Sequence, residues 1–317
     1  MSRPAYAAIE ARPGRACPTS YRYSPRDLDR EPEVVAGTLY VVGGLYGNVE
    51  ALDAIHAMAA REEGPVTIVF NGDFHWFDVD EGDFAHVTHS VLAHPAIRGN
   101  VETEVAGEDA GAGCGCAYPA DVSDAEVSRS NLILERLRAT ARNLPELRSR
   151  LGALPMHLTA QVGDARIGIV HGDPTSLAGW GFAHDRLDNP AHRRWIESMF
   201  REANVQAFAS THTCLPAFRR FGGGVVANNG AAGMPNFAGS HCGLVTRIGA
   251  RPHPSRLYGM QVTGVSIDAL RVDYDHARWM GRFLASWPEG SPAHDSYHRR
   301  ITQGTRFRLE QAIPTPA

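Results

Sequence analysis

Short apolar runs separated by amphipathic stretches dominate the hydrophobic pattern of this 317-residue chain. Runs of four or five apolar or β-branched residues between polar flanks are typical of strands that are buried on both faces. Two such runs, at 38–42 and 66–71, lie on either side of a segment, 49–59, whose apolar residues repeat at helical spacing. This order predicts a βαβ unit with a parallel strand pair, and therefore an α/β protein.

The second half of the chain is richer in predicted strands. A turn at Gly163-Asp164 separates the runs 157–162 and 166–171, which predicts a β-hairpin. Further strands are expected at 207–210, 217–221, 225–230, 243–248 and 258–267, and helices at 83–92, 123–141, 190–203 and 276–286.

We expect three regions along the chain. Residues 1–36 are rich in Pro and Arg and lack periodicity, so we predict an irregular N-terminal extension that packs on the body of the protein. Residues 37–275 form the main domain, with a Gly-, Ala- and Cys-rich insertion loop near 105–124. Residues 276–317 form a C-terminal helix and tail.

The composition excludes several classes of protein. A hydrophobic content of 43% and a charged content of 21% are those of an ordinary globular protein. The net charge of −4 predicts no general nucleic-acid partner, because such surfaces are basic. We expect no membrane association and a cytoplasmic location, since no run reaches ~20 apolar residues and the N-terminus lacks a signal-peptide core. Five cysteines, an odd number, argue against a disulfide framework and favour thiols or metal ligands.

Ligand-type residues follow several of the predicted strands. Open α/β sheets bind their ligands at the carboxyl ends of the strands, so these residues would gather along one edge. A carboxylate, an amide and two imidazoles suit a divalent or mixed-valence transition metal such as Mn, Fe or Zn. The candidate metal ligands, which are also the candidate catalytic residues, are Asp73, Asn100, His171 and His212.

The order of these motifs resembles that of the calcineurin-like metallophosphoesterases, whose pattern is Asp-x-His, Gly-Asp, Gly-Asn-(His), a lone His and Gly-His-x-His. The resemblance covers roughly residues 38–275, includes the segments 47–52 and 229–235, and is closest to the small phosphodiesterase/phosphatase branch. It implies a four-layer α/β/β/α sandwich of two mixed sheets. It also implies two metal ions and hydrolysis of a phosphate mono- or diester, with a small phosphorylated molecule as the partner.

One half of the implied two-metal site departs from the family pattern. Asp73, as the bridging carboxylate, and the other three candidate ligands match the second metal's ligands. By contrast, the first metal's aspartate falls on Gly44, its two histidines fall on Tyr46 and Cys214, and the histidine of Gly-Asn-His is Val101.

Two interpretations of this half-site remain open. In the first it is lost, which leaves a mononuclear enzyme or a non-hydrolytic protein that binds a metal or ligand. In the second it is rebuilt, with Tyr46 and Cys214 as phenolate and thiolate ligands, which suits iron, zinc or copper. Cys114 and Cys116 of the insertion loop could add thiolates, and free thiols at these positions would also permit redox chemistry.

Overall fold

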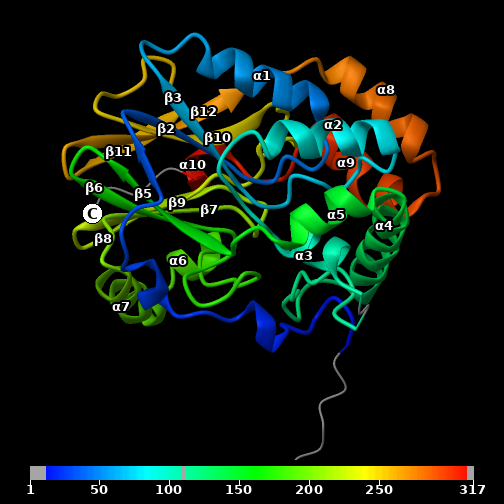
Figure 1. The fold of residues 1–317 in the computed structure, drawn as a ribbon, viewed down its shortest axis with the longest axis horizontal. Coiled ribbons are helices and arrows are strands. Elements are labelled where there is room, and N and C mark those ends of the chain that lie inside the picture. The colour runs from blue at the N-terminus through cyan, green and yellow to red at the C-terminus, as the bar shows by residue number, and fades with distance from the viewer. Residues whose placement is uncertain (1–11, 109–110, 313–317) are drawn as a thin grey trace, which may run out of the picture.

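Two six-stranded mixed sheets pack face to face, and helices cover both outer faces (Figure 1). The computed structural model describes residues 12–108 and 111–312. The four layers confirm the α/β/β/α sandwich that the sequence predicts.

The first sheet has the strand order β11-β12-β10-β2-β3-β4. Its central pair, β2 and β3, is parallel and joined by helix α1, as expected for the βαβ unit. The bounds are β2 (Thr38–Val42), α1 (Val49–Ala59), β3 (Val66–Asn71), β4 (Ala96–Ile97), β10 (Gly243–Gly249), β11 (Tyr258–Val262) and β12 (Val265–Val272).

The prediction of a single strand at 258–267 is wrong. The chain forms an antiparallel hairpin, β11 and β12, that turns at Thr263 and Gly264. Both turn residues have positive φ, 43° and 76°, which is the twist that a two-residue hairpin requires. A threonine in this conformation gives no clear turn signal in the sequence.

The second sheet has the order β1-β5-β6-β7-β9-β8. The predicted hairpin is confirmed as the antiparallel pair β5 and β6, and β7 and β9 continue the sheet in parallel with β6. The bounds are β1 (Val34–Ala36), β5 (His157–Val162), β6 (Ala165–Val170), β7 (Ala207–Ser210), β8 (Ala217–Phe221) and β9 (Gly224–Asn228).

The segment from residue 12 to residue 36 is more regular than predicted. Strand β1 pairs with β5 at the edge of the second sheet, and two 3₁₀ helices, Thr19–Tyr21 and Pro25–Leu28, precede it. Tyr21 and Leu28 are buried against the body. Residues 1–11 of the predicted extension lie outside the described residues.

Side chains alternate between two hydrophobic cores along the central strands. In β2, Leu39 and Val41 pack between the sheets, whereas Tyr40 and Val42 pack under the helices. Successive strand residues point to opposite faces, so a strand buried on both faces is apolar at every position. This explains the uninterrupted apolar runs in the sequence.

The helices divide between the two outer faces. Helices α1, α2 (Glu81–Val91), α4 (Asp124–Arg142), α5 (Pro145–Gly152), α8 (His276–Ser286) and α9 (Pro292–Gln303) share a core with the first sheet. Helix α7 (Arg193–Ala203) packs on the second sheet. The shorter helices are α3 (Asn100–Ala106), α6 (His184–Leu187), α10 (Leu309–Ala312) and the 3₁₀ helix Pro190–His192.

Helix α9 lies in the region that the sequence predicts to be a tail. Pro292 begins the helix at a position that tolerates its missing N–H, and only Ala293 and Ile301 are fully buried. So few buried apolar positions give a weak periodic signal. The helix packs against α4 and brings the C-terminal region to the site described below.

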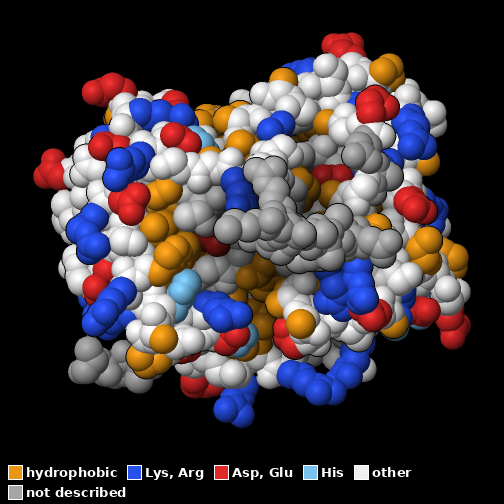
Figure 2. Space-filling view, turned by 90° about the horizontal axis from the view of Figure 1, so that it is seen from below, with side chains coloured by type: hydrophobic (Ala, Val, Ile, Leu, Met, Phe, Trp, Pro, Cys, Tyr) orange, Lys and Arg blue, Asp and Glu red, His pale blue; other side chains and the backbone are white. Residues whose placement is uncertain are grey.

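The surface carries mixed charge. On the part of the face in Figure 2 that is not grey, arginine and acidic side chains are interspersed, without one continuous basic field. No helix in residues 12–108 or 111–312 is long and apolar enough to cross a membrane.

The close approach of two backbone segments at Gly233 gives a test of the packing. A Cβ at Gly233 would meet the carbonyl group of Leu45 and lie 3.0 Å from Cβ of Asn48. We therefore expect Gly233→Ala to lower the free energy of unfolding by about 2–3 kcal/mol, measured by chemical denaturation. In the control Gly281→Ala, in the open middle of α8, alanine should leave stability unchanged or raise it by about 1 kcal/mol. Equal stability of the two variants would contradict the described packing.

Candidate metal centre

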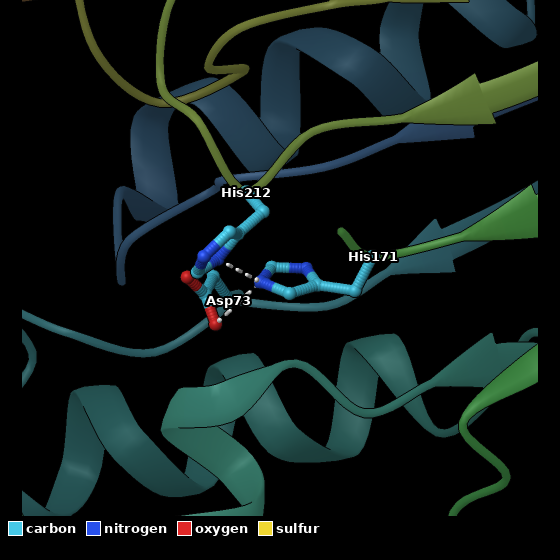
Figure 3. A group of neighbouring side chains, drawn as sticks. All are labelled: Asp73, His171 and His212. Carbon is cyan, nitrogen blue, oxygen red and sulfur yellow. Dashed lines mark hydrogen bonds and ion pairs between the residues drawn. The ribbon is translucent and has the colours of Figure 1, made fainter. Parts of the chain in front are cut away.

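Four buried side chains meet at the carboxyl ends of strands from both sheets. Nε2 of His171 lies 3.1 Å from Oδ1 of Asn100, 3.2 Å from Nδ1 of His212 and 3.4 Å from Oδ1 of Asp73. Figure 3 shows Asp73, His171 and His212 pointing toward one another. The structure thus brings together all four of the ligands that the sequence indicates.

Each ligand follows a strand directly. Asp73 lies two residues after β3, Asn100 begins α3 just after β4, His171 follows β6, and His212 follows β7 by two residues. Parallel strands end at the same edge, which is why residues so far apart in the chain converge.

Hydrogen bonds turn one lone pair of each neutral ligand toward the centre. His171 donates from Nδ1 to the carbonyl of Asn71 at 2.9 Å, which leaves the lone pair on Nε2. Asn100 donates from Nδ2 to the carbonyl of Cys114 at 2.9 Å, and His212 donates from Nε2 to the carbonyl of Cys116 at 3.2 Å. Outer partners of this kind fix the tautomer and orientation of metal ligands.

The lone pairs of the four candidate ligands face one another, so a positive charge between them would be stabilising. Burial and the charge of His171 lower the pKa of His212 to about 3, so His212 stays neutral. Burial acts to lower the pKa of His171 as well, but the Asp73 carboxylate outweighs it and raises that pKa. Burial acts to raise the pKa of Asp73, but His171 and His212 bring it below its usual value. A proton on His171 or a metal ion would satisfy these atoms.

The donor set fits one transition-metal ion. Within residues 12–108 and 111–312, Asp73, His171 and His212 form the group of His, Cys, Asp and Glu side chains whose ligand atoms all lie within 4.8 Å of one another. With the Asn100 oxygen, the set offers two nitrogens and two oxygens, which suits Mn, Fe or Zn.

Glu102 is a functional residue that the sequence analysis missed. It is fully buried on the first turn of α3, and its Oε2 accepts hydrogen bonds from the backbone N–H of Asp73 at 2.9 Å and of Gly99 at 2.8 Å. Its Oε1 accepts from Phe74 and His75 at 3.1 and 3.3 Å. Burial and the charge of Asp73 raise the pKa of Glu102. A Glu three residues after Gly99 is a capping signal that could have indicated it.

Tyr46 and Cys214 occupy the altered half-site as a hydrogen-bonded pair. Oη of Tyr46 lies 2.8 Å from Sγ of Cys214. A Cβ at Gly44 would lie 2.8 Å from the Tyr46 ring, so the ring fills the space where a carboxylate at position 44 would start. Burial raises the pKa of both groups, so both keep their protons near neutral pH. The phenolate and thiolate ligands of the rebuilt site remain a prediction that this arrangement does not favour.

Backbone strain is concentrated at the same place. Tyr46, Asp73 and Cys214 have φ values of 57°, 53° and 58°, in the left-handed region that L-residues rarely adopt. They are three of the six such non-glycine residues in the part of the chain that the structure describes. Strained residues cluster at functional sites because the surrounding fold must keep them in place.

Cys114 and Cys116 do not contribute free thiolates in this structure. Their sulfur atoms form a disulfide with each other, and a disulfide sulfur lacks the negative charge of a thiolate ligand. Their backbone carbonyls act instead, by accepting the hydrogen bonds of Asn100 and His212 described above. The insertion loop is therefore part of the centre through its backbone.

A cavity of about 150 Å³ opens beside the four ligands. Two tryptophans, Trp76 and Trp180, lie on its wall, and helix α9 adds Tyr297 and Arg300, which lie outside the region of family resemblance. The lining residues are Tyr46, Asp73, Trp76, Asn100, Val101, Cys116, Tyr118, Trp180, His212, Thr213, Cys214, Tyr297 and Arg300.

His75 and Asp78 follow Asp73 in the chain, but both are buried and neither lines the cavity. Nδ1 of His75 is 2.6 Å from Oδ2 of Asp78, and its Nε2 is 3.0 Å from the hydroxyl of Thr88. Both ring nitrogens are thus used within the protein, which gives His75 a structural role.

The fold is similar to those of two solved structures. A hypothetical protein from Pyrococcus horikoshii OT3 aligns with a TM-score of 0.60 and 16% identity, over 86% of this chain and 100% of that chain. A metallophosphoesterase from Sphaerobacter thermophilus aligns with a TM-score of 0.53 and 18% identity, over 84% of this chain and 100% of that chain. No protein-family model and no curated protein match the sequence. The chain therefore has the metallophosphoesterase fold, which confirms the resemblance at the level of the fold.

Because Glu102 accepts four backbone hydrogen bonds beside Asp73, we expect its substitution to lower both stability and metal affinity. In Glu102→Gln the amide group would face two of these N–H donors. We expect the free energy of unfolding to fall by about 2–3 kcal/mol and the metal affinity to fall about 10–100-fold. Denaturation and calorimetric metal titration would measure the two effects. The control Glu126→Gln changes the matching position of α4, which is exposed, and should cost less than about 1 kcal/mol with unchanged metal affinity. Unchanged metal affinity in a folded Glu102→Gln would contradict the role of Glu102.

Proposed function

We propose that this protein is a metal-dependent phosphoesterase that hydrolyses a phosphate mono- or diester of a small molecule. One observation carries the proposal: four lone-pair donors converge beside a cavity that Asp73, Asn100 and His212 line, within a metallophosphoesterase fold. Asp73, Asn100, His171 and His212 would hold a single divalent transition metal, Mn, Fe or Zn. Such an ion, when bound, polarises a phosphoryl oxygen and lowers the pKa of a water molecule.

Asp73 is the residue of the chain that is suited to orient the attacking water. Its Oδ1 accepts a hydrogen bond from the backbone N–H of Val101 at 3.2 Å and faces His171. Its Oδ2 accepts no hydrogen bond from the described residues, and Asp73 lies on the cavity wall. A carboxylate oxygen in this position can accept a hydrogen bond from water near the substrate.

The leaving group receives no proton from an imidazole at this site. Val101 stands where many relatives are implied to have a histidine. His212 faces the metal ligands with Nδ1 and donates from Nε2 to the carbonyl of Cys116, so neither nitrogen is free to act as an acid. The reaction therefore depends on how well the leaving group carries negative charge.

The alternative is a non-hydrolytic metal- or ligand-binding protein, or a redox protein, on the same scaffold. The observations that favour it are the Tyr46–Cys214 pair, which replaces metal ligands, and the Cys114–Cys116 disulfide on the cavity wall. Turnover of a phosphoester separates the two functions.

Asp73→Asn tests the proposed hydrolysis. Purified protein loaded with Mn, Fe or Zn should hydrolyse p-nitrophenyl phosphate or bis(p-nitrophenyl) phosphate, and Asp73→Asn should reduce kcat/KM at least about 100-fold because it weakens the metal site. Release of p-nitrophenol measures the rate. Asp53→Asn, on the exposed face of α1, is the control and should leave the rate unchanged. Absence of turnover with all three metals would reject the proposed function.

The missing acid predicts a steep dependence on the leaving group. Across a series of aryl phosphates, kcat/KM should fall as the pKa of the leaving phenol rises, and simple alkyl phosphates should react at least about 100-fold more slowly than p-nitrophenyl phosphate. Steady-state kinetics on such a series would measure the slope. A flat dependence would mean that another group on the cavity wall donates the proton.

A further inference from the structure

Arg300 places a positive charge on the wall of the cavity. It lies on α9, outside the region of family resemblance, and is half-buried. Its Nε donates to the carbonyl of Pro235 at 3.0 Å, and its Nη2 donates to the carbonyl of Cys214 at 2.8 Å. These two hydrogen bonds fix the plane of the guanidinium group on the wall of the cavity that Asp73, Asn100 and His212 also line.

No carboxylate of the described residues pairs with Arg300. Many other arginines of the chain form ion pairs, for example Arg138 with Glu104 and Arg282 with Glu50, but Arg300 contacts only neutral groups. A half-buried cation without a counter-ion is costly, and an anion in the cavity would compensate its charge.

Arg300 lies beside the altered half-site. Its charge acts on the thiol of Cys214 and on the hydroxyl of Tyr46, the two groups that stand where metal ligands are implied. The ring of Tyr46 excludes a carboxylate at position 44, so this side of the cavity lacks the anionic ligands of a second metal. The cavity is therefore lined by candidate ligands for one metal ion and by the guanidinium group of Arg300.

We propose that Arg300 takes the place of a second metal ion, and that its guanidinium group binds phosphate oxygens while a single metal is bound by the four ligands. The planar guanidinium matches two oxygens of a phosphate group at once and carries its charge at all working pH values. This inference rests on the proposed function in one respect: the proposed function identifies the anion that Arg300 binds as the phosphoryl group of the substrate. The C-terminal helix α9 thereby becomes part of the substrate site.

Binding of inorganic phosphate tests this role without any turnover. Isothermal titration of phosphate into metal-free and metal-loaded protein would compare the wild type with Arg300→Met, Arg300→Lys and Arg299→Met. Arg300→Met should lower phosphate affinity at least about tenfold in both states, which corresponds to about 1.4 kcal/mol. Arg300→Lys keeps the charge but cannot contact two phosphate oxygens in one plane, so its phosphate affinity should lie between those of the wild type and Arg300→Met. Arg299 is the exposed neighbour on the same helix, and Arg299→Met should match the wild type within about twofold.

Metal content is the second measurement. Wild-type and Arg300→Met protein should each bind one metal per chain, because Gly44, Tyr46 and Cys214 supply no anionic ligands for a second ion in either protein. Two metals per chain in the wild type would overturn the inference. So would an unchanged phosphate affinity in Arg300→Met, or no measurable phosphate binding by the loaded wild type at millimolar phosphate.

The outcomes separate this inference from the proposed function. Arg300-dependent phosphate binding without hydrolysis of any ester would support the anion site and reject the hydrolase. Hydrolysis by Arg300→Met with unchanged kcat and KM would support the hydrolase and overturn the role of Arg300. If Arg300→Met does not fold, Arg300→Lys decides, because it keeps donors for the carbonyls of Pro235 and Cys214, and an affinity equal to that of the wild type would overturn the inference.

Discussion

The candidate metal centre depends on one buried carboxylate, Glu102, that does not itself line the cavity. Glu102 accepts four backbone N–H groups, from the turn after β3 and from the turn before α3. These bonds join the segment that carries Asp73 to the segment that carries Asn100. They also compensate the left-handed conformation of Asp73, because a strained residue persists only where its surroundings fix it. Without this carboxylate, nothing else on α3 would satisfy the four donors.

The second feature of the site is that a positive side chain, Arg300, lies beside the half-site where the family resemblance implies a second metal ion. A second metal ion would need anionic ligands, but Gly44 has no side chain, and Tyr46 and Cys214 supply a phenol and a thiol that hydrogen-bond to each other. Arg300 brings a single permanent charge and hydrogen-bond direction, but it cannot activate water as a metal does. In the proposed function, this arrangement would keep the attraction for an oxyanion and leave water activation to the single metal ion.

Local sequence patterns account for most of the elements. Strands β2 and β3 and helix α1 lie within a residue of the predicted ranges, because strands buried on both faces and an amphipathic helix have distinct periodicities. The failures have local reasons as well. Thr263 is an unusual first residue for a two-residue hairpin turn, α9 buries too few apolar side chains to show a period, and β1 is only three residues long.

The sequence by itself indicated the four candidate ligands, since each follows a strand and the carboxyl ends of parallel strands converge. It also showed that Gly44, Tyr46 and Cys214 depart from the family pattern at the first half-site. Only the tertiary structure decided what replaced that half-site. The ring of Tyr46 fills the space beside Gly44, Cys114 pairs with Cys116, and Arg300 reaches the cavity from a helix 86 residues beyond Cys214. Contacts between segments so distant arise from packing and leave no periodic signal in the sequence.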